Sequence, residues 1–153
     1  MHRRWMLGVF TGAMMTVLAG CTGGPVEDPD DEDPDDDPTP TLQQVRIDST
    51  DCERPESATI SFDAANHQVS VRGCVTGRNT CHYPEVASAG YADGKFELRI
   101  VTEDQSDEGE MCAQVLTDRG YLAMADFDGG VPSEVEVIHD DVHGRAIVAT
   151  GSR

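Results

Sequence analysis

The stretch ATISFDAANHQVSV, residues 58–71, decides the fold class of this chain. Apolar and polar side chains alternate from Ala58 to Asp63, and the alternation resumes at Val69 and Val71. A period of two residues places the apolar side chains on one face of a β-strand. The interruption at 64–66 is short enough for a turn. The stretch therefore predicts two antiparallel strands joined as a β-hairpin.

The same alternation recurs along the rest of the domain. Glycine- and aspartate-rich breaks separate the segments, and Gly90 disfavours a long helix over Glu85–Ala92, the one helical alternative. About seven to nine short strands at this spacing predict an all-β fold, either an antiparallel β-sandwich of Ig-like type or a small barrel. Further strands are predicted at Val45–Asp48, Phe96–Ile100, Met111–Leu116, Tyr121–Phe127, Val135–Val137 and Ala146–Ala149.

The N-terminal residues are typical of an exported lipoprotein. Residues 1–20 combine a charged start with an apolar stretch that is too short for a stable membrane-spanning helix. The sequence LAGC at 18–21 resembles the lipobox of prokaryotic lipoproteins, in which the cysteine is lipidated. Arg3 and Arg4 resemble a twin-arginine export signal. We expect residues 1–20 to be a removable signal peptide and a two-chain lipid on Cys21 to hold the protein at the extracellular face of the cell membrane.

Residues 21–41 are predicted to be the lipidated cysteine followed by a disordered tether. Nine acidic residues stand between Glu27 and Asp37, interrupted only by prolines, and Val26 is the only large apolar residue. Such a segment buries too little apolar surface to fold. It also lacks the fixed turn that a calcium site needs. The folded domain is therefore expected at residues 42–153.

The chain is strongly acidic, with 29 Asp and Glu against 11 Lys and Arg and a formal net charge of −18. Residues 42–153 keep 20 of the acidic residues and 9 of the basic ones. Binding to nucleic acid requires a cationic surface, so no nucleic-acid partner is expected. The acidic surface repels itself in dilute buffer, and molar salt screens that repulsion. We interpret the acidity as an adaptation to high salt and not as a cation site.

Four cysteines of the domain form an even set in an exported protein, which favours two disulfides. Cys52 and Cys74 flank the predicted hairpin, so a bridge between them would close its open end. This argument favours Cys52–Cys74 together with Cys81–Cys112. The pairing of Cys74 with Cys81 and of Cys52 with Cys112 stays open as the alternative. No two cysteines have the two-residue gap of zinc or redox sites.

Several short motifs resemble uncharacterised lipoproteins exported by halophilic archaea. That group shares a cysteine–glutamine strand, an aromatic strand, a Gly-Gly-x-Pro turn and a final Val-x-Val-x-His strand. The resemblance implies a disulfide-bonded β domain at the cell surface, and it carries over no activity. It rests on Val71–Cys74, Cys81-His82, Met111–Gln114, Tyr121, Phe127–Pro132 and Val135–His139.

The candidate chemistry of the domain centres on histidine. His139 and His143 lie four residues apart with two carboxylates between them, and His82 is a third candidate ligand. On a helix the first two would share a face and could chelate copper or zinc. Here they follow a predicted strand, where that spacing does not make them converge, so we favour a solvated turn and keep metal binding as the alternative.

The expected function is noncatalytic binding. The sequence contains no nucleophile-and-base motif and no phosphate-binding loop. We therefore expect no enzymatic activity and no cofactor. The lipid, the long tether and the β domain together predict a surface-anchored module. Its partner is expected to be an extracellular protein or polymer, bound through strand edges and loops.

Overall fold

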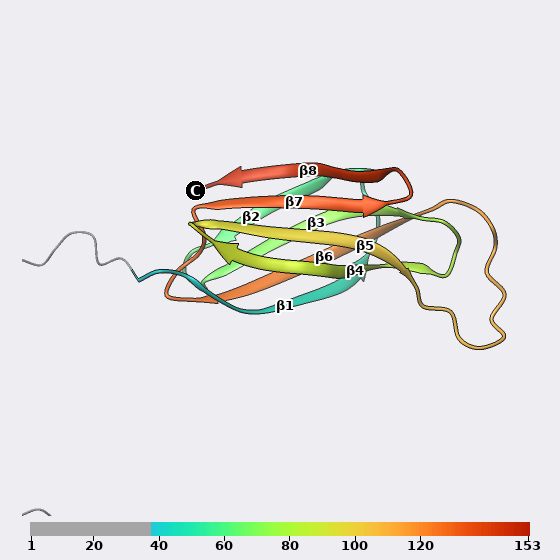
Figure 1. Ribbon diagram of the computed structural model, residues 1–153, viewed down its shortest axis with the longest axis horizontal. Helices are drawn as coiled ribbons and strands as arrows, with labels where there is room; N and C mark the ends of the chain where they lie inside the picture. The colour runs from blue at the N-terminus through green and yellow to red at the C-terminus, as the bar shows by residue number, and fades with distance from the viewer. Residues whose placement is uncertain (1–37) are drawn as a thin grey trace, which may run out of the picture. The chain divides into compact units, whose positions relative to one another are not determined.

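The computed structural model describes residues 38–153, which fold entirely as β-strands and connections (Figure 1). The predicted signal peptide, Cys21 and most of the predicted tether lie outside the described residues. Within 38–153 there is no helix. The strands are β1 (Thr41–Thr50), β2 (Ala58–Asp63), β3 (Gln68–Gly77), β4 (His82–Ala92), β5 (Lys95–Asp104), β6 (Thr117–Asp128), β7 (Glu134–Asp141) and β8 (Gly144–Ser152).

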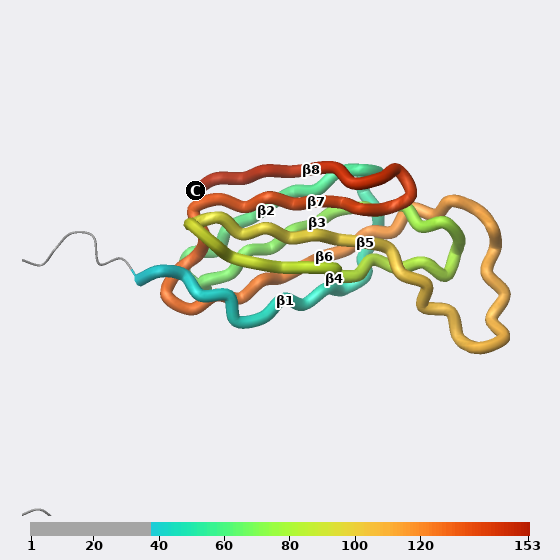
Figure 2. The backbone as a smooth tube through the Cα atoms, viewed as in Figure 1, coloured from blue at the N-terminus to red at the C-terminus, as the bar shows by residue number. Residues whose placement is uncertain are grey.

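The strands form two four-stranded sheets that pack face to face. One sheet has the order β1-β6-β3-β2 and the other has the order β4-β5-β7-β8. Every pair is antiparallel except β5 with β7. These two run parallel because β6, which lies between them in the chain, belongs to the other sheet, as Figure 2 shows. The predicted β-sandwich is confirmed with one parallel pair added, and the sheets do not close into a barrel.

The inward faces of the two sheets form one apolar core. Along β3, Val69 and Val71 are buried, whereas Ser70 and Arg72 between and beyond them point away from the core. This is the period-two pattern of a half-buried strand. Across the sheets, the rings of Phe96 and Phe127 meet edge to face with centroids 5.3 Å apart. The enclosed side chains are Val69, Val71, Val75, Phe96, Leu98, Ile100, Tyr121, Ala123, Ala125, Phe127, Val131, Val135 and Val137.

Local turn chemistry fixes the register of the hairpins. The predicted hairpin is β2–β3, whose turn is closed by a hydrogen bond from the Asn66 backbone N–H to the Asp63 carboxylate at 3.1 Å. The β4–β5 turn consists of Asp93 and Gly94, with φ angles of 51° and 81°. Two successive positive φ angles define the type I′ turn, for which Asp-Gly is a preferred pair. Both connections fall at breaks that the sequence predicts.

The structure excludes the helical alternative and contradicts one predicted strand. Residues 85–92, the helical alternative, belong to β4. Residues 111–116, predicted as a strand, are an irregular part of the long β5–β6 connection. The bridge from Cys112 and hydrogen bonds from Ala113 tie this segment to residues 80–81, which precede β4 and belong to no strand. With no strand edge beside it, the segment cannot join a sheet.

Candidate functional site

The alternating strand directions sort the connections onto two ends of the sandwich (Figure 1). One end holds residue 38, the C-terminus and the β2–β3, β4–β5 and β6–β7 connections. We call the opposite end the loop end. It is defined by the connections 51–57, 78–81, 105–116 and 142–143.

Both disulfides lie at the loop end. Cys52 is bonded to Cys74 and Cys81 is bonded to Cys112, the pairing that the hairpin argument favours. The first bridge fastens connection 51–57 to β3. The second fastens the long connection 105–116 to the segment between β3 and β4. Each bridge therefore restrains a connection that no sheet pairing holds.

Two glycines allow connection 51–57 to cross the sheet from β1 at one edge to β2 at the other. A Cβ atom on Gly120 of β6 would lie 2.3 Å from the carbonyl oxygen of Asp51, which passes over it. A Cβ atom on Gly73 of β3 would lie 2.6 Å from the Tyr121 hydroxyl and 2.8 Å from the carbonyl oxygen of Ser57. A glycine inside a strand often marks such a close approach of backbone. The glycines of β6 and β3 therefore leave room for the connection.

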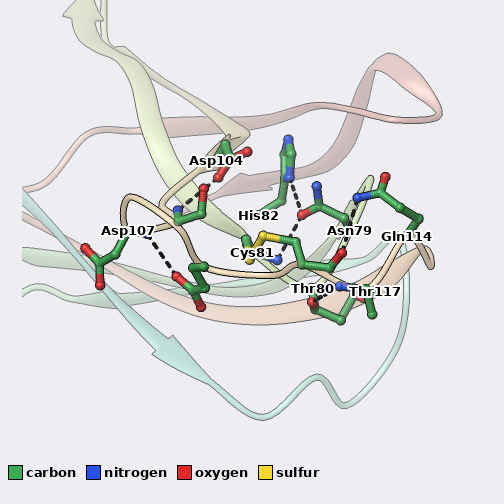
Figure 3. Close-up of a disulfide and its surroundings, with 12 residues drawn as sticks. Asn79, Thr80, Cys81, His82, Asp104, Asp107, Gln114 and Thr117 are labelled. Atoms are coloured by element: carbon green, nitrogen blue, oxygen red, sulfur yellow. Dashed lines mark hydrogen bonds between the residues drawn. A yellow bond between two sulfur atoms is a disulfide. The ribbon is translucent and has the colours of Figure 1, made fainter.

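Connection 105–116, which we call the long loop, is held by hydrogen bonds as well as by its disulfide (Figure 3). The Thr80 N–H donates to the Ala113 carbonyl at 3.2 Å, and the Ala113 N–H donates to the Thr80 hydroxyl oxygen at 2.9 Å. The Gln105 N–H donates to the Cys81 carbonyl at 3.0 Å. The long loop is therefore anchored at its start and near its end.

A reciprocal pair of bonds closes the tip of the long loop. The Glu110 N–H donates to the Asp107 carbonyl at 3.0 Å, and the Asp107 N–H donates to the Glu110 carboxylate at 2.9 Å. The Asp107 side chain itself points away from the bridge and its surroundings (Figure 3). The tip thus has a defined turn that presents a carboxylate outward.

Arg119 supports the segment that carries the second bridge. Its guanidinium lies 4.4 Å from the centroid of the Tyr83 ring, in cation–π contact. It also donates hydrogen bonds to the carbonyl oxygens of Thr80 and His82. This one side chain connects the start of β6 to the end of the β3–β4 connection. It thereby fixes the base to which the long loop is tied.

The second half of the long loop, residues 111–116, is unusual for this domain because it exposes large apolar side chains. Met111 is 95 % exposed, Val115 is 55 % exposed and Leu116 is 61 % exposed. Ile147 on β8 is the only other large apolar side chain in residues 38–153 that is this exposed. Exposed apolar side chains that gather in one place mark interaction sites more often than isolated ones do.

The three candidate metal ligands occupy separate environments. His139 is buried in the core at 2 % exposure, whereas His143 is exposed in the β7–β8 turn. The His82 ring nitrogen Nδ1 lies 2.8 Å from the Asn79 side-chain oxygen. Residues 38–153 contain no group of three or more His, Cys, Asp or Glu placed to hold a metal ion. The structure therefore does not bring together His139, His143 and His82, the candidate ligands of the metal-binding alternative.

His139 instead forms a buried polar pair with Tyr121. The Tyr121 hydroxyl and the His139 Nε2 atom are 2.7 Å apart, and His139 Nδ1 has no hydrogen-bond partner. Burial lowers the pKa of His139 to about 4, against a smaller opposing effect of Asp141. Burial also raises the pKa of the Tyr121 hydroxyl. Both side chains are therefore neutral near pH 7, which suits a structural pair between the two sheets.

A pocket of about 150 Å³ lies beside the first bridge. Arg54 and Arg72 line it, and neither forms an ion pair within residues 38–153. Asp51 and Glu53 line the same pocket, so its wall carries charges of both signs. The pocket therefore does not define the charge of a ligand.

Sequence reasoning gives no role to several residues that shape the loop end. Arg119 and Gly120 precede Tyr121 at the start of β6, and all three stabilise this end of the molecule. Glycine inside a strand pattern is a usable signal of close backbone approach, so Gly120 could have been found. The partners of Arg119 and Tyr121 lie in distant parts of the chain, and a single sequence does not show them.

Fold and site define the described part of the chain as a disulfide-bonded β-sandwich with one structured loop end. Comparisons with protein-family models, with curated proteins and with solved structures find no match. Residues 38–153 contain no helix that could span a membrane.

Proposed function

We propose that the protein is a lipoprotein anchored at the extracellular face of the cell membrane and adapted to high salt. Its noncatalytic β-sandwich binds an extracellular protein or polymer through the loop end. The N-terminal motifs described above support the anchor, which is a lipid on Cys21. The acidic composition of the domain supports the adaptation to salt.

The observation that carries this proposal is the segregation of the connections. The chain enters the sandwich at β1, at the end opposite the loop end. A tether attached there leaves the loop end free to meet a partner. Both disulfides and three of the four large exposed apolar side chains lie on that free end. Loops held on a rigid β scaffold are a frequent arrangement for binding.

Membrane fractionation of producing cells tests the anchor. The Cys21→Ser protein should remain unprocessed or appear in the medium, because the lipid and not the domain holds it. A Cys21→Ser protein that is still processed and still sediments with membranes would overturn the anchoring proposal.

Photo-crosslinking in the same cells tests the binding end. p-Benzoylphenylalanine replaces Arg78 or His143 at the loop end, or Ala65 or Ala92 at the other end; all four positions are exposed. We expect discrete adducts only from the loop-end positions. Equal adducts from both ends would show that the loop end is not the binding surface.

No structural observation favours metal binding as a second function, and calorimetry can decide the point. Titration of the domain with Cu²⁺ and Zn²⁺ should give no binding tighter than about 10 micromolar, since His139 is enclosed and bonded to Tyr121. Tight binding that His139→Leu abolishes would restore the metal hypothesis.

A further inference from the structure

We propose that the long loop, residues 105–116, is the docking element of the loop end. The partner is a protein with an apolar recess bordered by Lys or Arg side chains. This inference rests on the proposed function and adds the element and the chemistry of the partner.

Apolar exposure singles out the long loop from the other connections. Three of the four large, exposed apolar side chains in residues 38–153 belong to it, namely Met111, Val115 and Leu116. The domain has 20 acidic residues, so three exposed apolar side chains in one connection are unexpected. An apolar recess on a partner would remove these side chains from water, at about 25 cal/mol per Å² of buried surface.

The long loop is also held in position before any partner binds. The Cys81–Cys112 bridge and the paired hydrogen bonds between Thr80 and Ala113 fix its apolar limb. The reciprocal bonds of Asp107 and Glu110 fix its tip. Binding by a pre-organised loop loses little conformational entropy.

Asp104 and the long loop together form two limbs of different charge, an acidic limb at 104–110 and an apolar limb at 111–116. Residues 104–110 contain four acidic side chains and no basic one, while residues 111–116 contain no charged side chain. Asp104 and Glu110 accept hydrogen bonds from backbone N–H groups of the loop. The carboxylates of Asp107 and Glu108 make no hydrogen bond or ion pair within residues 38–153. Because these two carboxylates adjoin the apolar residues 111–116 in the chain, a protein that covers 111–116 would place cations opposite them.

The same charges decide between a protein and a membrane as the occupant. Biological membranes present anionic headgroups, which repel carboxylates and attract polybasic segments. Placing Asp107 and Glu108 against such a surface would oppose insertion of Met111. A protein recess can match both limbs at once, with apolar side chains facing 111–116 and basic side chains facing 104–110. The observations therefore favour a protein.

Crosslinking from the full-length, anchored protein in producing cells tests this inference. p-Benzoylphenylalanine replaces Met111 or Leu116, and the matched control replaces Ile147, which is 59 % exposed on β8. We expect one discrete protein adduct from both loop positions and at least tenfold less from Ile147. Mass spectrometry of the adduct should place the crosslink in an apolar segment with Lys or Arg nearby.

Charge variants test the acidic limb in the Met111-substituted protein. Asp107→Asn with Glu108→Gln should reduce the adduct at least fivefold. Glu85→Gln with Glu97→Gln, exposed positions on β4 and β5, removes the same charge and should leave the adduct unchanged. Equal thermal melts of all variants would confirm that they fold.

The contrary outcomes are distinct. Adducts from Arg78 or His143 without adducts from Met111 or Leu116 would overturn this inference and leave the proposed function standing. No adduct from any loop-end position would overturn both. A lipid adduct at Met111, or flotation of the lipid-free domain with phosphatidylcholine–phosphatidylglycerol vesicles, would show that the long loop binds a membrane and not a protein. Equal loss of adduct in both charge variants would remove the requirement for cations at this loop.

Discussion

At the scale of single residues, the buried pair of Tyr121 and His139 joins the two sheets through polar atoms. Tyr121 lies on β6 and His139 lies on β7, and their rings meet at 73° with centroids 5.6 Å apart. Gly73 makes room for the hydroxyl, because any larger residue there would contact it. Gly73, Tyr121 and His139 are far apart in sequence, yet their side chains or the space beside them must fit together.

Removal of the tyrosine hydroxyl should destabilise the domain. Tyr121→Phe leaves both ring nitrogens of buried His139 without partners, which costs about 1–3 kcal/mol. The double variant Tyr121→Phe with His139→Leu removes both polar groups and should lose less than the two single losses added together. Urea unfolding of the four proteins measures this. Strict additivity would show that the pair does not interact.

The low pKa of His139 predicts a loss of stability in mild acid. The folded pKa is about 4, below the 6.5 of an unperturbed histidine, so the unfolded chain binds more protons between these values. The domain therefore has its full free energy of unfolding above about pH 6.5, and it loses part of that free energy as the pH falls toward 4. The loss due to His139 amounts to about 3 kcal/mol.

Urea unfolding at a series of pH values, with the wild-type protein and His139→Leu in parallel, checks this effect. The variant should lack the part of the slope between pH 6.5 and 4 that the histidine causes. The same slope in both proteins would mean that His139 is not responsible.

At the scale of elements, each disulfide restrains one connection, and the two should have different consequences. The Cys81–Cys112 bridge spans 31 residues and the Cys52–Cys74 bridge spans 22. Each contributes about 2–4 kcal/mol in the chain-entropy model, with a few tenths more for the longer span. The effect of each bridge on its own connection is easier to measure than this small difference in overall stability.

Limited proteolysis should reveal that local difference. Replacing Cys81 and Cys112 by Ala frees the long loop, so a protease should cut within 105–116 while the sheets stay folded. Replacing Cys52 and Cys74 by Ala should leave 105–116 as resistant as in the wild type. A nonreduced digest of the wild type should yield the same two linked pairs. A peptide linking Cys74 to Cys81 would contradict the connectivity.

Glycine substitutions test whether connection 51–57 lies over β6. Gly120→Ala would place a methyl group within 2.3 Å of a carbonyl oxygen of the connection, so we expect a loss of about 2 kcal/mol or more. Gly90→Ala on β4 is the matched control, because nothing lies within 4 Å of its Cβ position. It should gain about 0.5–1 kcal/mol. Thermal melts of the two variants compare them; equal effects would contradict the crossing.

The contrast between the hairpin and the long loop shows how far sequence reasoning reaches. The β2–β3 hairpin was predictable because its register depends on neighbouring residues, through alternation and a short turn. The segment 111–116 has strand-like composition, but a distant cysteine and Thr80 hold it outside the sheets. The parallel β5–β7 pair arises because β6 belongs to the other sheet. Local sequence patterns do not show to which sheet a strand belongs.

The candidate site was less predictable than the fold, and His139 shows why. Its spacing to His143 is that of a chelating pair, yet the strand alternation that the same sequence predicts turns its ring inward. Its partner Tyr121 lies on the other sheet. A ligand-like motif on a strand therefore has to be weighed against the face on which each side chain lies.

At the scale of the whole molecule, charge is the dominant feature. Within residues 38–153, Lys and Arg pair with only three carboxylates, those of Asp126, Glu136 and Asp140. The other acidic side chains have no such partner within 4 Å. The sandwich therefore combines a neutral, apolar core with a surface whose charges repel one another. Its stability should depend on the solvent more than on any single contact.

Rising salt should therefore stabilise the domain. The Debye length falls from about 10 Å at 0.1 M salt to about 3 Å at 1 M, which screens repulsion between exposed carboxylates. If screening adds about 2 kcal/mol, the melting temperature should rise by about 8 °C, since 1 kcal/mol corresponds to about 4 °C or more for a domain of this size. Thermal melts of the domain in 0.1 to 2 M sodium chloride measure the rise. Sodium chloride is preferred to sulfate, which also strengthens apolar burial.

A charge-reduced variant separates screening from other effects of salt. Changing Glu53, Glu85, Glu97 and Glu103 to Gln removes four exposed carboxylates that have no Lys or Arg partner within residues 38–153. This variant should be more stable than the wild type at 0.1 M salt, and its melting temperature should rise less with salt. The two curves should converge toward 1 M, where repulsion is screened in both proteins. Parallel curves, or a wild-type melting temperature that stays flat, would show that repulsion does not limit stability and would remove the argument for adaptation to high salt.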